Sequence, residues 1–264
     1  MLLKPDKDTG VVLINKNDYV RKLSEIISDE KKFSRCSKEK DETEKVEGEI
    51  TGLLKALKLQ GHIDNAAYGR LNLCESTIPR LYGPPKIHKE GAPTGPIMPM
   101  VNSLYHAMAQ WLVELLEPIR RRLATHSLRD SFQFVGKTKD LDLQEKTMFS
   151  LDVVSLFTNV PLLKTVESIC DQIKARNMYV GIPVTILKEL LLPCTRNVQR
   201  LFNSTIYRQM DGVVMGSPLV PLLAGCFVAK LERSMLSQTI EGLAHYSRYM
   251  DDIFCVIANM TSNR

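Results

Sequence analysis

The segment that most constrains the fold of this chain is residues 245–257, which read HYSRYMDDIFCVI. Two adjacent carboxylates, Asp251 and Asp252, separate two runs rich in apolar and β-branched residues, which predicts a strand, a tight turn carrying both acids, and a returning strand. Two carboxylates buried side by side would repel each other, and one would take up a proton unless a cation compensated their charge. The pattern therefore indicates a β-hairpin with an acidic tip and a hard divalent metal ion beside it. The alternative is an ordinary solvated turn, in which paired Asp residues are common.

Another carboxylate lies at the end of a second apolar run. Residues 147–152 read TMFSLD, which predicts a strand that delivers Asp152 at its end. Apolar residues at helical spacing follow from Leu162 to Ile173, so we expect a loop and then an amphipathic helix. A carboxylate at a strand end is well placed to meet another from a neighbouring strand.

A third segment, residues 212–225, combines glycine with a helix start. Gly216 permits a close approach of the backbone, and Ser217 followed by Pro218 is typical of an N-cap and a first helical residue. We therefore expect a long apolar helix here. Before it, residues 201–207 predict one strand, followed by a turn.

Extended and helical patterns alternate in the N-terminal half. Residues 11–14 predict a short strand, and helical spacing continues through residues 20–60, around a mixed-charge run at 31–49 that is typical of a solvated helix face or loop. The Pro and Gly density of residues 78–97 predicts extended strands and turns whose basic and aromatic side chains suit phosphate and base contacts. A proline-rich surface loop is the alternative there. Residues 103–122 predict a helix whose last three Arg residues are explained equally well by the helix dipole and by RNA binding.

Composition sets broad limits. The 264 residues are 44% hydrophobic and 25% charged, which predicts a globular chain with one large or two small domains. The net charge of +5 permits an acidic partner such as nucleic acid without requiring one. The six cysteines have no metal-ligand spacing, so we expect reduced thiols and no disulfide-linked partner. With no signal peptide and no apolar run long enough to span a bilayer, we expect an intracellular protein and no membrane partner.

The motifs together resemble one family. The order of Asp152, the Gly-Ser-Pro start at 216–218 and the Tyr-Met-Asp-Asp hairpin at 249–252 is similar to the palm motifs of reverse transcriptases. The segments GPPKIHK at 83–89 and SLDVVSLFTNVP at 150–161 resemble the Penelope-like retroelement branch in particular. Several motifs at compatible spacing make a chance turn a weak explanation for the paired acids.

The resemblance covers about residues 4–258 and implies an α+β fold of the right-hand polymerase type, with an antiparallel palm sheet packed on helices and a fingers region. Residues 1–145 are then expected to form a fingers-like N-terminal region and residues 146–264 a truncated palm, with the thumb absent. A nuclear location is expected from the resemblance alone.

The implied activity is RNA-directed DNA polymerisation, in which dNTPs are added to the 3′-OH of a DNA primer on an RNA template. Two Mg²⁺ ions, or Mn²⁺, would assist the transfer, since divalent ions stabilise both the attacking and the leaving oxygen. The resemblance assigns catalytic roles to Asp152, Asp251 and Asp252, and assigns ion binding to Asp152, Asp251 and the backbone of Val153. Asp252 is expected beside the site rather than as a direct ligand.

The resemblance also assigns substrate contacts. Phe157 stands where the family places a residue under the nucleotide sugar, and a bulky ring there would clash with a ribose 2′-OH and so favour a DNA product. The alternative is that Phe157 is only a core aromatic residue. The implied nucleotide contacts are Phe157, Gly216, Ser217 and Lys86, and the implied template and primer contacts are Lys89, Tyr249 and Met250.

Some positions depart from the family pattern. Gly95 stands before Pro96 and Ile97, where the family usually has an Arg that can hold triphosphate. Val220 and Gly225 replace a Ser and an acidic or amide residue that are usual near the start and end of the Gly-Ser-Pro segment. These departures favour some loss of function around intact carboxylates.

Two classes of function remain open. The chain is either an active RNA-directed DNA polymerase or a catalytically inactive retroelement remnant that folds and at most binds RNA. A telomerase or intron-type reverse transcriptase is a lesser alternative within the first class. Phe157 and the Tyr249-Met250 pair argue against an RNA-directed RNA polymerase.

Overall fold

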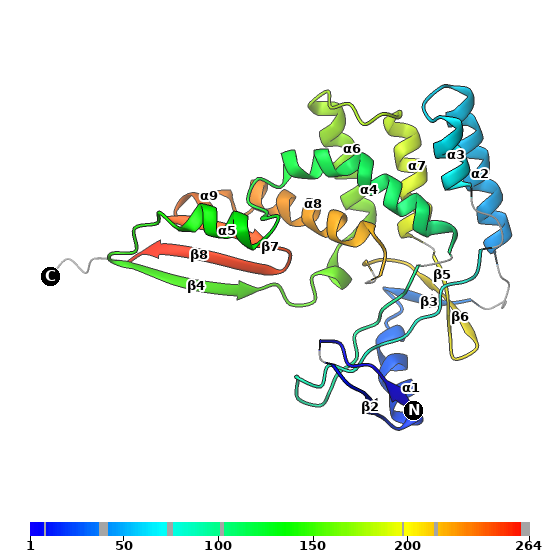
Figure 1. Cartoon of the computed structure of the whole chain (residues 1–264), viewed down its shortest axis with the longest axis horizontal. Helices are drawn as coiled ribbons and strands as arrows, with labels where there is room; N and C mark the ends of the chain where they lie inside the picture. Colours follow the sequence, from blue (N-terminus) through cyan, green and yellow to red (C-terminus); the bar gives the residue numbers. More distant parts are fainter. Residues whose placement is uncertain are drawn as a thin grey trace.

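The computed structural model describes residues 1–7, 9–36, 42–72, 76–100, 103–196, 198–213 and 216–259. Helices and strands are mixed along the chain, as the α+β prediction requires. Figure 1 shows a sheet that forms an arm, a central layer of helices, and an N-terminal part with α1 (Lys16–Ile27) and β2 (Val12–Leu13).

The arm is an antiparallel sheet with the strand order β4-β8-β7. The strands are β4 (Lys146–Asp152), β7 (His245–Tyr249) and β8 (Asp252–Ala258). These bounds confirm the predicted strand before the first carboxylate and the predicted hairpin. β8 lies between the other two strands, because β4 pairs with it along one edge and β7 along the other.

Helix side chains contact both faces of this sheet. On one face, the ring of Phe134 in α5 (Ser131–Thr138) lies edge-on against Phe254, with the centroids 5.1 Å apart. On the other face, Arg248 is paired with Glu232 of α8 (Leu219–Ser234). The assignment of residues 1–145 to the fingers stays a prediction, but α5 and the residues just before it lie against this sheet.

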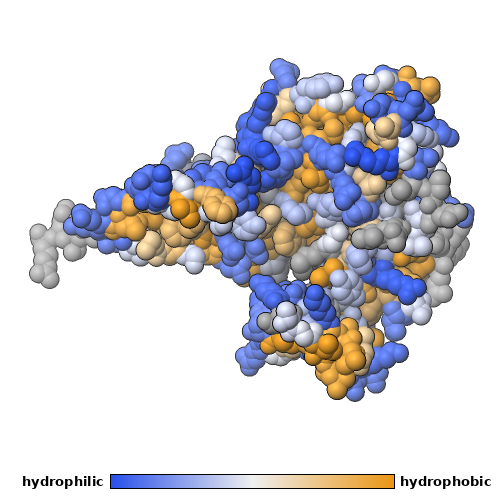
Figure 2. Space-filling view, in the orientation of Figure 1, coloured by the Kyte–Doolittle hydropathy of each residue, from blue (hydrophilic) through white to orange (hydrophobic). Residues whose placement is uncertain are grey.

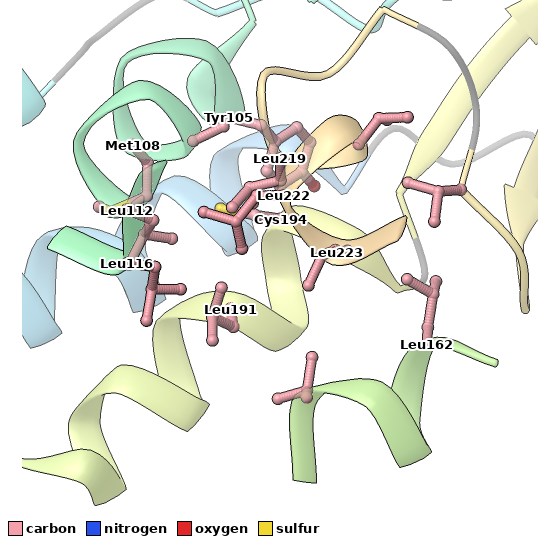
Figure 3. Close-up of a cluster of buried hydrophobic side chains, with 14 of the residues drawn as sticks. Tyr105, Met108, Leu112, Leu116, Leu162, Leu191, Cys194, Leu219, Leu222 and Leu223 are labelled. Carbon is pink, nitrogen blue, oxygen red and sulfur yellow. The ribbon is translucent and has the colours of Figure 1, made fainter. Parts of the chain in front are cut away.

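The hydrophobic core lies in the helical layer. It is formed by α4 (Leu104–Leu123), α6 (Leu162–Ala175), α7 (Val184–Thr195) and α8, and Figure 3 shows their side chains meeting. Leu112, Leu191 and Leu223 have no exposed surface. Fully burying one such leucine contributes about 1.5–3 kcal/mol, so the packing of this layer contributes substantially to stability. The short helix α9 (Ser237–Glu241) follows α8.

The N-terminal part confirms the alternation of strand and helix. β1 (Leu2–Leu3) pairs with β2, Asn15 caps α1, and α2 (Thr43–Leu59) and α3 (Asn65–Leu71) pack together. The charged run predicted as a solvated helix face or loop is partly the exposed face of α2, and residues 37–41 lie outside the described residues. The prediction was wrong at residues 33–35, which form a strand paired with a later part of the chain. The proline-rich stretch is extended, with bridges between Tyr82 and Ile97 and between Pro85 and Thr94.

The prediction of one strand over residues 201–207 was wrong. The chain forms a hairpin, β5 (Gln199–Phe202) and β6 (Thr205–Gln209), whose turn has positive φ at Asn203 (44°) and Ser204 (63°). Asn and Ser tolerate this region better than branched residues do. β6 also pairs with β3 (Phe33–Arg35), giving a second sheet in the order β3-β6-β5.

β4 is exposed along most of its length, including the large apolar residues Met148 and Leu151. Figure 2 shows hydrophobic side chains among hydrophilic ones on the arm. β4 lies at the edge of the sheet, which leaves these side chains open to solvent.

The cysteines agree with reduced thiols as far as they are described. Cys36, Cys170, Cys194, Cys226 and Cys255 are free, and the last four are buried. Cys74 lies outside the described residues.

Within the described ranges, the helices are either too short or too polar to cross a lipid bilayer.

Candidate active site

The acidic hairpin ends in a two-residue turn. Tyr249 pairs with Asp252, so Met250 and Asp251 form the tip, and Met250 has a left-handed φ of 54°. Asp252 is the first residue of β8. The expectation that both acids lie in the turn is therefore corrected, because only Asp251 does. The two side chains leave the backbone from different structural positions, which gives them different surroundings.

The third carboxylate joins them through the backbone. Asp152, the last residue of β4, is directly opposite Asp252 in the β4-β8 register. One residue further, the amide of Val153 donates a hydrogen bond of 3.0 Å to the carbonyl oxygen of Asp251. The sheet therefore brings all three predicted acids to one end, as expected for carboxylates at the ends of neighbouring strands.

The acids are less buried than the sequence argument for a metal ion assumed. Asp152 and Asp252 are exposed and Asp251 is half-buried. Water can therefore screen the two exposed charges, and burial alone does not require a cation. The argument for an ion now depends on the convergence of the carboxylates, because nearby like charges still repel.

The loop after Asp152 is fixed by its contacts with residues 212 and 213. Phe157 begins a short 3₁₀ turn, η1 (Phe157–Asn159), and its carbonyl oxygen accepts a 2.8 Å hydrogen bond from the amide of Val213. Gly212 has a φ of 75°, and a Cβ there would lie 2.7 Å from the carbonyl oxygen of Thr158. Phe157 itself is half-buried and packs against the core. Phe157 thus lies in a fixed loop shortly after Asp152 in the chain, and part of its side chain is exposed to solvent.

The Gly-Ser-Pro segment lies against the end of the extended N-terminal stretch. Gly216 has a φ of 118°, and a Cβ there would lie 1.9 Å from the carbonyl oxygen of Met98. The hydroxyl of Ser217 accepts a 3.3 Å hydrogen bond from the amide of Leu219. The helix is assigned from Leu219, one residue later than predicted, but the capping contact of Ser217 is present.

Sequence comparison now decides the family. A family model described as reverse transcriptase (RNA-dependent DNA polymerase) matches residues 87–263. This chain belongs to the reverse transcriptase family. Among curated proteins, no match to this chain was found.

Solved structures with a similar fold come from telomerases. Apo telomerase of Candida tropicalis, truncated from its C-terminal domain, is 12% identical, with a TM-score of 0.59 over 98% of this chain and 52% of that chain. Candida albicans telomerase with a fragment of telomeric RNA is 9% identical, with a TM-score of 0.55 over 97% and 45%. The Candida tropicalis enzyme with such a fragment is 13% identical, with a TM-score of 0.53 over 72% and 37%. The chain spans about half or less of the length of these proteins, and the likeness shows that its fold is of the right-hand polymerase type.

The two lysines expected to contact nucleotide or template in this reverse transcriptase, Lys86 and Lys89, lie on the extended stretch. The amide of Lys86 donates to the carbonyl of Pro93, and the ammonium of Lys22 holds the turn through the carbonyls of Gly91 (2.7 Å) and Ala92 (2.9 Å). The side chain of Lys86 is half-buried and that of Lys89 is exposed. The described contacts do not connect Lys86 or Lys89 with the carboxylates, so their roles stay predictions.

Tyr249 lies beside the acids and at the edge of a cavity. The cavity has a volume of about 640 Å³ and lies between α5 and the sheet, with Phe134, Tyr249, Asp252 and Phe254 among its lining residues. Tyr249 is half-exposed, as a contact to a nucleic acid strand would require. Its predicted role toward template or primer stays a prediction.

The donor set at the sheet end suits a hard divalent cation. Reverse transcriptase domains generally use divalent metal ions, and the carboxylates of Asp152 and Asp251 together with the carbonyl of Val153 offer oxygen ligands. Three His, Cys, Asp or Glu side chains arranged to hold an ion are not found among the described residues. Mg²⁺ commonly keeps one or two protein carboxylates and takes its other ligands from water and phosphate, so two carboxylates are chemically sufficient.

Sequence reasoning missed one part of this site. Arg248, immediately before Tyr249, is fully buried and pairs with Glu232, which lies on α8 and is also buried. The available signals were a charged residue within the predicted strand before the acids and an acid on the predicted helix after Pro218. Those residues are rarely buried unless they are paired.

Proposed function

We propose that this reverse transcriptase domain extends a DNA primer on an RNA template by adding dNTPs to the primer 3′-OH. The observation that carries the proposal is the convergence of Asp152 with Asp251 and Asp252 at one end of the β4-β8-β7 sheet. Nucleotidyl transfer needs oxygen ligands of this kind where the reacting phosphate lies.

Asp152 and Asp251 are the residues proposed to hold the divalent ions, Mg²⁺ or Mn²⁺, with the carbonyl of Val153 beside them. When two such ions are bound, they stabilise negative charge on the attacking and leaving oxygens. Asp252 lies on the strand rather than in the turn, and its negative charge keeps the site attractive to cations. The backbone hydrogen bond from Val153 to Asp251 holds the two chain segments together without using either carboxylate.

The nucleotide is proposed to lie between η1 and the start of α8. Phe157 would contact the sugar and exclude a 2′-OH by its bulk. Gly216 would allow the nucleotide to approach the backbone closely. The hydroxyl of Ser217 already accepts a hydrogen bond from the amide of Leu219, so Ser217 would contribute to nucleotide binding mainly by its position at the start of α8. Lys86 would neutralise triphosphate, and Lys89, Tyr249 and Met250 would contact template or primer.

The proposed subclass is the Penelope-like branch. It is supported by the segments at 83–89 and 150–161, which carry the resemblance. A telomerase-type enzyme is the second candidate, favoured by the telomerase structures with a similar fold. An RNA template is consistent with both, and two of those telomerases were solved with telomeric RNA.

An inactive RNA-binding remnant is the alternative from another class. Gly95, which is buried, stands in place of the Arg usual in the family, and it cannot supply a cation to triphosphate. Lys86 comes from the same extended stretch and is the described cation best suited to replace it.

The test is primer extension by the purified 264-residue protein on an RNA template annealed to a DNA primer, with Mg²⁺ and dNTPs. Asp251→Asn is the active-site variant, and Asp171→Asn, an exposed carboxylate on α6, is its matched control. We expect extension by the wild type and the control, none by Asp251→Asn, and equal binding of the RNA–DNA hybrid by all three. A wild type that binds the hybrid but never extends it would support the remnant instead.

A further inference from the structure

Arg248 connects the catalytic turn to the helix behind it. Its Nε donates a 2.7 Å hydrogen bond to Oε1 of Glu232, and a second guanidinium nitrogen lies 3.4 Å from Oε2. The remaining terminal nitrogen, NH1, donates a 3.1 Å hydrogen bond to the carbonyl oxygen of Met250. One planar group therefore holds both a carboxylate of α8 and the backbone of the turn that carries Asp251.

The hydrogen-bond network formed by Arg248 and Glu232 is buried, and both side chains make several hydrogen bonds. The side chains of Arg248 and Glu232 are 0% and 1% exposed. The hydroxyl of Tyr246, two residues before Arg248 on the same face of β7, donates a 3.0 Å hydrogen bond to Oε1 of Glu232. A charge taken out of water keeps its place only where its hydrogen bonds are satisfied, so the guanidinium has little freedom to move.

The hydrogen bond from Arg248 is made to the residue of the turn that has a left-handed backbone conformation. Met250 has a φ of 54°, which is uncommon for a residue with a side chain, and its carbonyl group begins the peptide that leads into Asp251. Fixing that carbonyl fixes the orientation of the peptide plane and thus the direction in which the Asp251 side chain leaves the backbone. On the other side, Asp251 is held by Val153.

We propose that Arg248 is a positioning residue that sets the orientation of Asp251 through the carbonyl of Met250, with Glu232 as its anchor on α8. The fork geometry of arginine suits this role, because its planar guanidinium sets donors in fixed directions, two toward the carboxylate and one toward the carbonyl, whereas the three donors of a lysine ammonium all leave one nitrogen. Glu232 lies in the last turn of α8, and Gly216 and Ser217 precede its first turn, so the helix links this contact to the proposed nucleotide side. The catalytic consequence rests on the proposed function, whereas the ordering of the turn does not.

The variant that tests this is the double substitution E232M/R248M. Removing only Arg248 would leave Glu232 buried without a partner and risks unfolding, whereas replacing both members of a buried pair by apolar residues of similar volume is often tolerated. Tyr246→Phe is the matched control, because it removes a hydrogen bond to the same carboxylate without touching the turn. Arg248→Lys tests whether charge alone is enough.

Three measurements are made on each protein: the thermal melting curve, hydrogen exchange of the amides in residues 249–253, and the kinetics of primer extension. For E232M/R248M we expect a melting temperature close to that of the wild type and faster exchange in the turn. We also expect a kcat about 10²-fold lower with little change in KM for dNTP, since a small displacement of a catalytic group costs about that much. Arg248→Lys should recover only part of kcat, and Tyr246→Phe should resemble the wild type.

Unchanged exchange in the turn of a folded E232M/R248M protein would overturn the proposal, whatever its activity. An equal loss of kcat in Tyr246→Phe would also overturn it, because the network in general, and not the bond to Met250, would then be responsible. If the wild type extends no primer, the proposed function fails, but the exchange measurement still decides whether Arg248 orders the turn.

Discussion

The amide nitrogen of Val153 lies 3.0 Å from the carbonyl oxygen of Asp251, which it hydrogen-bonds. This bond continues the β4-β8 ladder one step beyond the pair formed by Asp152 and Asp252. Because it joins two backbones, it fixes the positions of the carboxylates without depending on their charge. Substitutions that remove a charge should therefore leave the framework of the site intact.

Asp152→Asn should abolish primer extension and leave stability nearly unchanged. The side chain is exposed, so the expected change in the free energy of unfolding is within about 0.5 kcal/mol. The amide cannot replace the carboxylate as an anionic ligand. Denaturant unfolding measured beside primer extension checks both parts, and an active Asp152→Asn protein would remove Asp152 from the catalytic set.

Phe157→Val should relax the choice of sugar. A smaller side chain leaves room for a 2′-OH, and differences of this size in an apolar pocket change selectivity by about 10- to 200-fold. We expect the ratio of kcat/KM for dNTP to that for NTP to fall by such a factor. Phe227→Val is the control, because Phe227 lies on α8 and packs against the same core. Equal ratios in both variants would favour the reading of Phe157 as only a core residue.

Gly216→Ala should destabilise the protein strongly. The Cβ would lie 1.9 Å from the carbonyl oxygen of Met98, at a φ of 118° that residues with side chains rarely adopt. Backbone strain at residue 216 and displacement of the Met98 carbonyl are together expected to lower the free energy of unfolding by more than about 2 kcal/mol. Gly52→Ala in α2 is the opposite control, because nothing lies within 4 Å and alanine favours a helix by about 0.5–1 kcal/mol. Urea unfolding of both variants gives the comparison, and a stable Gly216→Ala protein would contradict the observed packing.

His245 should make stability depend on pH in the mildly acidic range. Burial lowers the pKa of His245 below its usual value of 6.5, and the nearby Lys137 lowers it further. The unfolded chain then binds a proton more readily than the folded one, so this contribution to stability is present above pH 6.5 and is lost as the pH falls toward the folded pKa. Melting temperatures between about pH 7.5 and pH 5 should therefore fall less in His245→Gln than in the wild type. Parallel curves for the two proteins would exclude this contribution.

Predictions from local sequence patterns were correct for elements whose structure depends mainly on their own residues. Runs of apolar and β-branched residues around the paired acids predicted the hairpin, helical spacing predicted α4 and α6, and the Gly-Ser-Pro start predicted α8. The predictions were wrong where the position of a turn depends on how neighbouring strands pair. The strand predicted at 201–207 is broken by a turn at Asn203 and Ser204. Asp252 belongs to the strand because its partner Tyr249 fixes the register of the hairpin.

The sequence by itself determined the family, the order of the motifs, and the identity of the three candidate acids, because these follow from residue types at fixed local spacing within each motif. Only the tertiary structure decided that Asp152 faces Asp252, that Gly216 meets Met98, and that Arg248 and Glu232 meet behind the turn. Such contacts join elements distant in the chain, and they are selected by packing of the whole core rather than by the preferences of either segment. Burial of the Arg248 guanidinium, which places it on the carbonyl of Met250, has no local signature beyond a charged residue in a strand.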